Sequence, residues 1–258
     1  MKLKLLALAA TAAMSLGSLA SAQTVKVGVA SEPYPPFTVP DSSGHWSGWE
    51  VDIMNAICKD QKLECVITPV AWDGIIPALT SGQIDMFMSS MSITAARKKV
   101  IDFSDKYYET PAAMATAKDA TFDTSPKGMK GKVIGIVISS SNAAYAHNFY
   151  DKSGATLKTY QTQDEADQDL AAGRIDATIA DEFALQGFLD TDQGKDCCKI
   201  AKILPYDKET LGDGIGAGFR KSDTALRKKF NKGIADIRKD GEYQKITKKY
   251  FKYDIFGG

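Results

Sequence analysis

The stretch Leu79-Thr80-Ser81-Gly82-Gln83-Ile84-Asp85 returns later in the chain as Leu170-Ala171-Ala172-Gly173-Arg174-Ile175-Asp176. In each copy a glycine ends a helical run and a strand begins. The first strand leads to Ser89 and Ser90, and the second leads to Asp181. Ligands of open α/β sheets bind beyond the carboxyl ends of strands. The repeat therefore favours two half-proteins whose polar groups face each other, although shared helix-to-strand chemistry alone also produces matches this short.

Around this repeat, short β-rich runs alternate with amphipathic helical runs, which is typical of an α/β fold with largely parallel sheets. Strands are expected at 24–29, 63–69 and 84–88 and, in a second sheet, at 132–138, 157–160 and 175–180. Helices are expected at 49–59, 73–81, 142–150, 164–172, 182–189, 224–239 and 242–251. Asp223 is suited to cap the helix that starts at Thr224.

The N-terminus has the three parts of a cleavable secretion signal. Lys2 and Lys4 precede the apolar run 5–19, which ends in the small residues Ala20-Ser21-Ala22. The apolar run is shorter than the roughly 18 residues of a membrane span, and polar sequence follows from Gln23, so a retained anchor is the weaker interpretation. No cysteine directly follows the cut, which argues against a lipid tether. We expect cleavage after Ala22 and a soluble, periplasmic product.

The length of the chain indicates how many domains it forms, and its net charge bears on which ligands it binds. Residues 23–258 exceed the commonest domain length of about 100 to 150 residues, so two cores are expected. The whole chain balances 32 basic against 32 acidic residues, and loss of Lys2 and Lys4 leaves 30 against 32, a net charge of −2. This balance gives no electrostatic support for binding nucleic acid.

Four cysteines in a secreted chain indicate disulfides. Cys58 and Cys65 bracket a short polar segment between an expected helix and strand, and an oxidising compartment favours a bridge between them over free thiols. Cys197 and Cys198 are neighbours, and a ring between neighbours is strained. A free pair, a vicinal disulfide and a bond between molecules all remain open for them.

No metal or other cofactor is expected. The two histidines, His45 and His147, are isolated in sequence, and neither forms a recognised ligand spacing with the cysteines. No nucleophile motif and no phosphate-binding loop appear either.

The residues after the first half-repeat carry a family resemblance. They read Ser89-Ser90-Met91-Ser92-Ile93-Thr94-Ala95-Ala96-Arg97 and then Ile101-Asp102-Phe103-Ser104-Asp105-Lys106-Tyr107-Tyr108. This stretch closely resembles the signature of the polar amino-acid-binding proteins of ABC importers, which include the lysine/arginine/ornithine, histidine and glutamine binders. Further motifs extend the resemblance over the mature chain: Tyr34-Pro35-Pro36-Phe37, Gly48-Trp49-Glu50-Val51-Asp52, 173–181 and 240–251.

The resemblance implies the two-lobed, type II periplasmic-binding-protein fold. Each lobe would be a mixed, mostly parallel sheet flanked by helices, with 23–110 and 211–258 in the first lobe and 111–210 in the second. The two chain crossings would form a hinge near 109–113 and 206–213. The resemblance also implies that the lobes close on a free amino acid, which is handed in a transient encounter to a membrane permease. We expect a monomer.

Arg97 and Asp181 are the expected contacts of the ligand's two charges. The guanidinium of Arg97 offers a planar fork of donors that matches a carboxylate, with Ser92 beside it. The resemblance assigns the α-ammonium to Asp181. The alternatives are an exposed arginine on a short helix and, for Asp181, an N-cap of the helix at 182–189.

Further polar groups are expected around the ligand. Ser140, Ser141 and Asn142 match the loop in which the family donates hydroxyls and backbone N–H groups at a helix start. Ser139 stands where the family usually has glycine, which puts the path of this loop in question. Ser89 and Ser90 would accept hydrogen bonds beside the ligand side chain.

The ligand side chain is expected between Tyr34 and Trp72, unless these rings are ordinary core residues. Glu32 is either a solvated loop charge or a partner for a distal cation. The favoured ligand is therefore arginine, lysine, ornithine or a related conjugate. A binder of glutamine or cystine is the alternative, although it would have to desolvate Glu32.

Two other functions compete with amino-acid binding. A periplasmic enzyme resembling cyclohexadienyl dehydratase would need a general acid or base, for which Glu32, Asp181 or a histidine would serve, but neither histidine lies in a recognised ligand segment. A sensory domain would need a membrane span and a signalling module in the same chain. We therefore expect a binding protein that is not an enzyme.

We predict that freshly exported protein carries the Cys58–Cys65 bridge, because an oxidising compartment and a short separating loop both favour closure. Peptide mapping without reduction measures it directly. A linked pair of peptides is expected, whereas recovery of both cysteines as free thiols would contradict the prediction.

Overall fold

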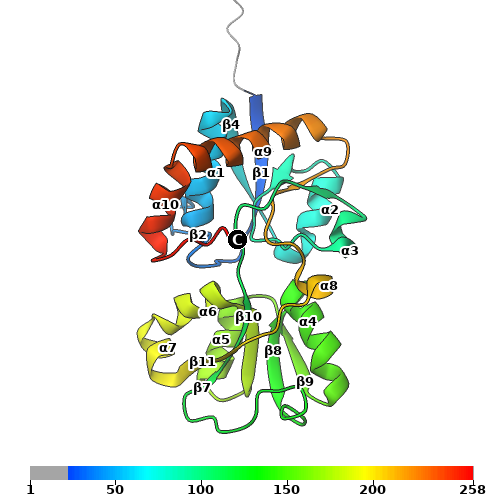
Figure 1. Cartoon of the computed structure of the whole chain (residues 1–258), viewed down its shortest axis with the longest axis vertical. Coiled ribbons are helices and arrows are strands. Elements are labelled where there is room, and N and C mark those ends of the chain that lie inside the picture. The colour runs from blue at the N-terminus through cyan, green and yellow to red at the C-terminus, as the bar shows by residue number, and fades with distance from the viewer. Residues whose placement is uncertain (1–22, 258) are drawn as a thin grey trace, which may run out of the picture.

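The computed structural model of the protein describes residues 23–257. Two groups of strands and helices lie one above the other in Figure 1, and each surrounds its own five-stranded sheet. The fold is the expected two-lobed α/β architecture. The expected secretion signal, with cleavage after Ala22, lies outside the described residues.

The first lobe is built on a sheet in the order β4-β1-β5-β12-β6. Strand β1 (Gln23–Ala30) pairs in parallel with β4 (Leu63–Val70) on one side and with the short β5 (Met86–Phe87) on the other. Strand β12 (Gly218–Phe219) runs antiparallel to both β5 and β6 (Asp102–Phe103). The sheet is therefore mixed, and the C-terminal part of the chain supplies one of its strands.

The second lobe is built on a sheet in the order β11-β7-β10-β8-β9. Strand β8 (Val133–Val137) pairs in parallel with β9 (Thr156–Tyr160) and with β10 (Ala177–Asp181). Strand β7 (Ala112–Ala117) runs antiparallel to β10 and to β11 (Cys198–Ile203). All five residues of β10 are buried, so its carboxyl end delivers Asp181 to the protein interior.

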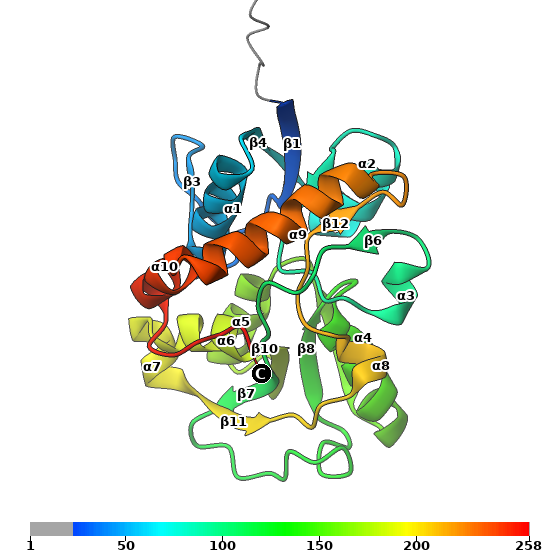
Figure 2. The same cartoon turned by 45° about the horizontal axis from the view of Figure 1, so that its top comes forward.

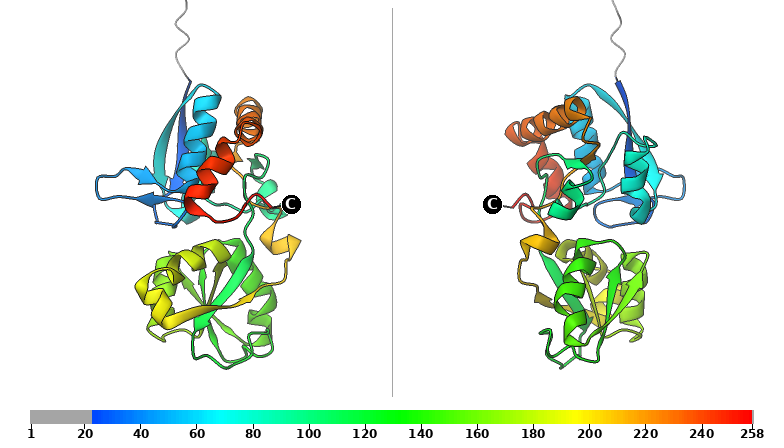
Figure 3. Two further views of the ribbon diagram at one scale, coloured as in Figure 1. Left: turned by 60° about the vertical axis from the view of Figure 1, so that its left-hand side comes forward. Right: turned by 90° about the vertical axis from the view of Figure 1, so that its right-hand side faces the viewer.

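Helices flank both sheets, as the two side views in Figure 3 show. The helices and the small sheet of the first lobe are α1 (Trp49–Asp60), α2 (Ile75–Thr80), α3 (Ala95–Lys98), α9 (Thr224–Lys239), α10 (Glu242–Tyr250), a 3-10 turn (Trp72–Gly74), and the pair β2 (Val39–Pro40) and β3 (Trp46–Ser47). The helices of the second lobe are α4 (Ser141–Phe149), α5 (Gln163–Ala171), α6 (Glu182–Leu189), α7 (Asp192–Cys197) and a 3-10 turn (Asp151–Ser153).

The chain passes between the lobes twice, once between β6 and β7 and once between β11 and β12. The short helix α8 (Lys208–Leu211) lies on the second passage, as Figure 2 shows. The hinge expected at 109–113 overlaps β7, which already begins at Ala112. The lobe boundaries at 110 and 210 stay a prediction.

Six of the strands, β2, β3, β6, β7, β11 and β12, were not expected from the sequence, and β7 and β11 are the longest of them. Strand β7 reads Ala-Ala-Met-Ala-Thr-Ala, and alanine is a poor strand former, so only its burial between two neighbours explains it. Strand β11 contains two lysines and shifts register between Ile200 and Lys202. Asp223 stands at the N-cap position of α9 as expected, but its side chain makes no capping bond and forms an ion pair with Arg220 at 2.7 Å instead.

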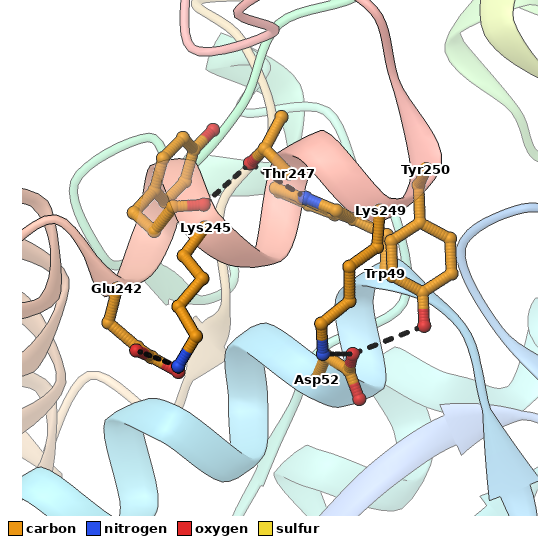
Figure 4. A network of polar contacts seen from close by, with 8 residues as sticks. Trp49, Asp52, Glu242, Lys245, Thr247, Lys249 and Tyr250 are labelled. Carbon is orange, nitrogen blue, oxygen red and sulfur yellow. Dashed lines mark hydrogen bonds and ion pairs between the residues drawn. The ribbon is translucent and has the colours of Figure 1, made fainter.

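The core of the first lobe joins α1 to α10, nearly 200 residues later (Figure 4). The buried indole of Trp49 donates a hydrogen bond to the hydroxyl of Thr247 at 3.0 Å. One turn further along α1, the carboxylate of Asp52 accepts from the ammonium of Lys249 at 3.0 Å and the hydroxyl of Tyr250 at 3.2 Å. The C-terminal helices are therefore an integral part of the first lobe.

Both pairs of cysteines form disulfides. Cys58 at the end of α1 is joined to Cys65 on β4, as expected. Cys197 and Cys198 are joined to each other, so the structure has the vicinal disulfide among the three alternatives. Across residues 23–257, none of the helices combines the length and the apolar character that a membrane span requires.

A buried carboxylate lies on α5 in the second lobe. Asp167 is 3% exposed, and its side chain accepts a hydrogen bond from the amide of Gln163 at 2.8 Å. Burial raises the pKa of Asp167 to about 7. Between the unfolded-state pKa of about 4 and this value, the folded protein holds a proton that the unfolded chain has released. This group therefore makes the folded state less stable as the pH rises through that window.

We predict that Asp167→Asn unfolds at a higher temperature than the parent protein at pH 8, by about 2–4 °C, the shift that roughly 1 kcal/mol produces at this size. The difference should shrink near pH 5, where the carboxyl of the parent is itself protonated. Thermal unfolding at both pH values measures it, with the exposed Asp164→Asn on the same helix as control. A variant less stable than the parent at pH 8 would contradict the prediction.

Candidate functional site

One cavity between the two lobes is lined by all eleven residues that the sequence singles out as ligand contacts. They come from both lobes: Glu32, Tyr34, Trp72, Ser89, Ser90, Ser92 and Arg97 from the first, and Ser140, Ser141, Asn142 and Asp181 from the second. Gln161, Thr162 and Gln163 line the same cavity and were not expected there. Within residues 23–257, no group of three or more side chains suited to hold a metal ion is present.

Arg97 lies at the edge of this cavity on the short helix α3. The hydroxyl of Thr94 caps the helix by accepting from the Arg97 backbone N–H at 3.3 Å. The guanidinium donates to the carbonyl oxygens of Ser92 and Ser139, both at 2.9 Å, and lies 5.8 Å from the ring centre of Trp72. Burial lowers the pKa of Arg97 to about 10, so the group stays charged at neutral pH. Of its five N–H donors, two serve these carbonyls and the rest remain for a ligand.

The loop at Ser139 keeps a conformation that normally favours glycine. Its φ angle is +58°, in the left-handed region that costs a residue with a Cβ some strain. The carbonyl of Ser139 holds Arg97, and the hydroxyl of Ser140 then caps α4 by accepting from the Ala143 N–H at 2.9 Å. The loop therefore binds Arg97 although Ser139 replaces the usual glycine. The hydroxyl of Ser140 is already engaged in capping α4.

Asp181 ends β10 and is 8% exposed. Its carboxylate accepts from the hydroxyl of Tyr34 at 2.8 Å and from the amide of Asn142 at 3.0 Å. Burial raises the pKa of Asp181, and these two hydrogen bonds oppose the rise. Asp181 does stand at the N-cap position of α6, but its side chain makes no capping bond there. Across residues 23–257, the buried Oδ1 of Asn142 has no hydrogen-bond partner.

Four hydrogen bonds join the two lobes around the cavity. Besides Tyr34 to Asp181 and Arg97 to Ser139, the hydroxyls of Ser92 and Ser141 lie 2.9 Å apart. The indole N–H of Trp72 donates to the carbonyl of Ile138 at 2.9 Å. Both aromatic residues expected to contact the ligand thus also hold the lobes together, and the structure is that of closed lobes.

Glu32 and Ser89 each have a hydrogen-bond partner within the first lobe. The carboxylate of Glu32 accepts from the backbone N–H of Trp72 at 3.2 Å. The buried hydroxyl of Ser89 accepts from the backbone N–H of Ala30 at 2.9 Å. Glu32 is half-buried, and only one of its carboxylate oxygens accepts from Trp72. The residue therefore supports the cavity wall and also adds a carboxylate to it.

The comparisons with known proteins agree with this geometry. Residues 25–253 match the model of the bacterial extracellular solute-binding proteins, family 3. The chain belongs to this family.

Two relatives and one solved structure are similar to the chain over 90% of its length or more. The chain is 38% identical to the L-arginine-binding protein of Pseudomonas aeruginosa, over 99% of this chain and 98% of that protein. It is also 38% identical to the lysine/arginine/ornithine-binding periplasmic protein of Escherichia coli, over 99% and 97% of the two chains. An ancestral arginine-binding protein bound to arginine superposes with a TM-score of 0.80 at 32% identity, covering 90% of this chain and 99% of that one.

Sequence reasoning missed a buried acid beneath the site of this solute-binding protein. Glu50 on α1 is 1% exposed, and its carboxylate accepts from the backbone N–H of Ser90 at 2.8 Å and from the Ser90 hydroxyl at 3.1 Å. The hydroxyl of Tyr107 donates to the same carboxylate. Burial raises the pKa of Glu50, and these donors lower it. Ser90 has a φ angle of +50°, so Glu50 holds a strained residue of the cavity wall in place.

We predict that Glu50→Gln lowers the free energy of unfolding by about 1–3 kcal/mol, because the new amide N–H group would face a donor that now binds the carboxylate. Ligand affinity should fall as well, since Ser90 loses its support. Thermal unfolding and calorimetry measure the two effects. Asp52→Asn, two residues further along α1, is the matched control and should cost less than about 1 kcal/mol, as exposed ion pairs do. An equal effect of the two substitutions would contradict the prediction.

Proposed function

We propose that the protein binds a basic amino acid, such as arginine, lysine or ornithine, between its lobes and delivers it to an ABC importer. One observation carries the proposal: Arg97 from one lobe and Asp181 from the other line the same cavity. A free amino acid carries a carboxylate and an ammonium on neighbouring atoms. It is therefore the smallest common ligand that satisfies both side chains at once.

The α-carboxylate would bind the remaining donors of Arg97, close to the hydroxyls of Ser92 and Ser141. The α-ammonium would bind Asp181 and the unpartnered Oδ1 of Asn142. Each contact would add to what the protein's own side chains supply, namely a positive charge in contact with Asp181 and a donor for Asn142.

The side chain of the ligand would lie between Tyr34 and Trp72, with Glu32 in reach of a distal cation. An aromatic face attracts a guanidinium or ammonium group, and a half-buried carboxylate strengthens that preference. The names of the two relatives support this choice, because one is an arginine binder and the other a lysine/arginine/ornithine binder. A glutamine or cystine binder would gain nothing from Glu32.

Membership of an extracellular solute-binding family supports export, a periplasmic location and a transient encounter with a membrane permease. Cleavage after Ala22 and a monomeric state are part of this proposal. The relatives reported above are binding proteins, and we propose that this protein likewise performs no chemistry on its ligand. Unchanged ligand after prolonged incubation with purified protein is the expected result, and turnover would favour the dehydratase alternative.

We predict that Arg97→Ala weakens arginine binding by tens- to thousands-fold, because a buried carboxylate that loses its charged partner typically costs about 2 to 5 kcal/mol. Isothermal titration calorimetry measures the change. Lys98→Ala is the matched control, since Lys98 follows on the same helix, is exposed and lies outside the cavity wall. Near-normal affinity in a folded Arg97→Ala protein would remove Arg97 from the binding site.

We predict that arginine, lysine and ornithine bind more tightly than glutamine, glutamate and cystine at one ionic strength. Glu32→Gln should weaken the three basic ligands by about tenfold, because a charge-assisted contact is lost, and should leave glutamine nearly unchanged. Asp119→Asn removes the same charge from an exposed turn and is the control. If a neutral ligand binds best, or if Glu32→Gln leaves the basic ligands unaffected, the choice of a basic ligand is wrong.

A further inference from the structure

The two lobes also meet away from the ligand cavity, at the first turn of α6. Phe183 follows Asp181 by two residues in the second lobe, yet its ring is buried in the aromatic core of the first lobe. Its ring centre lies 5.5 Å from that of Phe251 and 5.5 Å from that of Tyr253. Both partners belong to the tail after α10, and the C-terminus of this tail lies at the boundary of the lobes in Figures 1 and 3.

The tail itself is fixed to the first lobe. The ring of Phe251 lies 5.8 Å from Phe37 and 6.2 Å from Trp49, both fully buried. Further along, the backbone N–H of Glu109 donates to the carbonyl of Ile255 at 2.8 Å. The contact of Phe183 with the tail is therefore a contact between the lobes.

A continuous chain of rings links this contact to the ligand cavity. Tyr34 stacks on Phe37 at 5.8 Å, Phe37 contacts Phe251, and Phe251 contacts Phe183. Asp181, two residues before Phe183, accepts the hydrogen bond of Tyr34. Tyr34 and Asp181 are therefore linked in two ways, directly by a hydrogen bond and indirectly through the packed rings that lead to Phe183.

The next turn of α6 also lies against the first lobe. A Cβ atom on Gly187 would stand 3.4 Å from the carbonyl oxygen of Pro35 and 3.8 Å from the ring of Pro36. These are ordinary van der Waals distances, so α6 packs directly against the loop that carries Tyr34. A bulky side chain at this position would lie beside this loop.

We propose that Phe183 is a closing latch, a positioning residue that inserts between Phe251 and Tyr253 when the lobes close and stabilises the closed state for every ligand. The inference rests on the proposed binding function. Each aromatic pair of this kind contributes roughly a 2- to 10-fold factor to an equilibrium constant. The latch residues do not line the ligand cavity, so they act on closure and leave ligand recognition to the cavity.

This mechanism has a signature that distinguishes it from a contact with the ligand. A shift in the closing equilibrium multiplies the dissociation constant of every ligand by the same factor. Loss of a cavity residue instead changes the ratio of the dissociation constants of different ligands, because each ligand makes different contacts with that residue. A purely structural residue would lower the melting temperature and leave the affinity of the folded protein as it was.

The test compares Phe183→Ala and Tyr253→Ala with the control Phe188→Ala, which lies on the same helix and packs against the core of the second lobe. Tyr253 is half exposed, so its substitution should leave the fold intact. Dissociation constants for arginine, lysine and glutamine are measured by calorimetry, dissociation rates by stopped flow, and melting temperatures without ligand. Gly187→Trp, which places a bulky ring beside the Pro35–Pro36 loop of the other lobe, is a fourth variant.

We expect Phe183→Ala to raise all three dissociation constants by about tenfold and Tyr253→Ala by about threefold, with unchanged ratios between ligands and faster dissociation. Gly187→Trp should act in the same direction, and Phe188→Ala should change only the melting temperature. Unchanged or improved affinity in both Phe183→Ala and Tyr253→Ala, or changes that differ between ligands, would overturn the latch alone. If the parent protein bound none of the three amino acids, the proposed function would fail and the latch with it.

Discussion

The buried carboxylate of Asp181 is the constraint on which the rest of the site depends. It lies at the end of a fully buried strand, receives neutral hydrogen bonds from Tyr34 and Asn142, and feels the charge of Arg97 only through space. Burying an ionised carboxylate without a bound cation is unfavourable, which is why its pKa rises. In the proposed function a ligand ammonium would remove this penalty, so the site would select a molecule that brings a positive charge to this point.

In the proposed function the same carboxylate would couple binding to closure. Asp181 belongs to the second lobe and Arg97 to the first, so a ligand that satisfies both must touch both lobes. The protein already supplies cross-lobe bonds of its own through Tyr34, Trp72 and the Ser92–Ser141 pair. These bonds let the closed state form, and the ligand then adds the charge pairs that favour it over the open state.

Short sequence motifs predicted the two-lobed fold and most of the residues at the candidate site. The change from a helix through a glycine to a strand depends on only a few neighbouring residues. The two half-repeats therefore correctly predicted that Ser89 and Ser90 follow one strand and that Asp181 ends another. The family resemblance supplied most of the other polar residues of the cavity wall, but not Gln161, Thr162 or Gln163. It also left open whether Ser139 would follow the path of the usual glycine, and the left-handed φ of this serine answers that question.

The features that sequence missed depend on distant partners. Glu50 is buried because Ser90 and Tyr107 surround it with donors, and an acid is otherwise rarely buried. Strand β7 forms from alanines because a strand flanks it on each side, and Phe183 packs outside its own lobe because two aromatic residues of the C-terminal tail contact it. None of these partnerships has a local signature in the sequence.

A crystal structure of the protein with L-arginine would test the central claim most directly. The account predicts closed lobes, the ligand carboxylate on the guanidinium of Arg97, the α-ammonium on Asp181 and Asn142, and the ligand guanidinium between Tyr34 and Trp72. Arginine bound to one lobe only, or outside this cavity with Asp181 still bonded only to Tyr34 and Asn142, would contradict it.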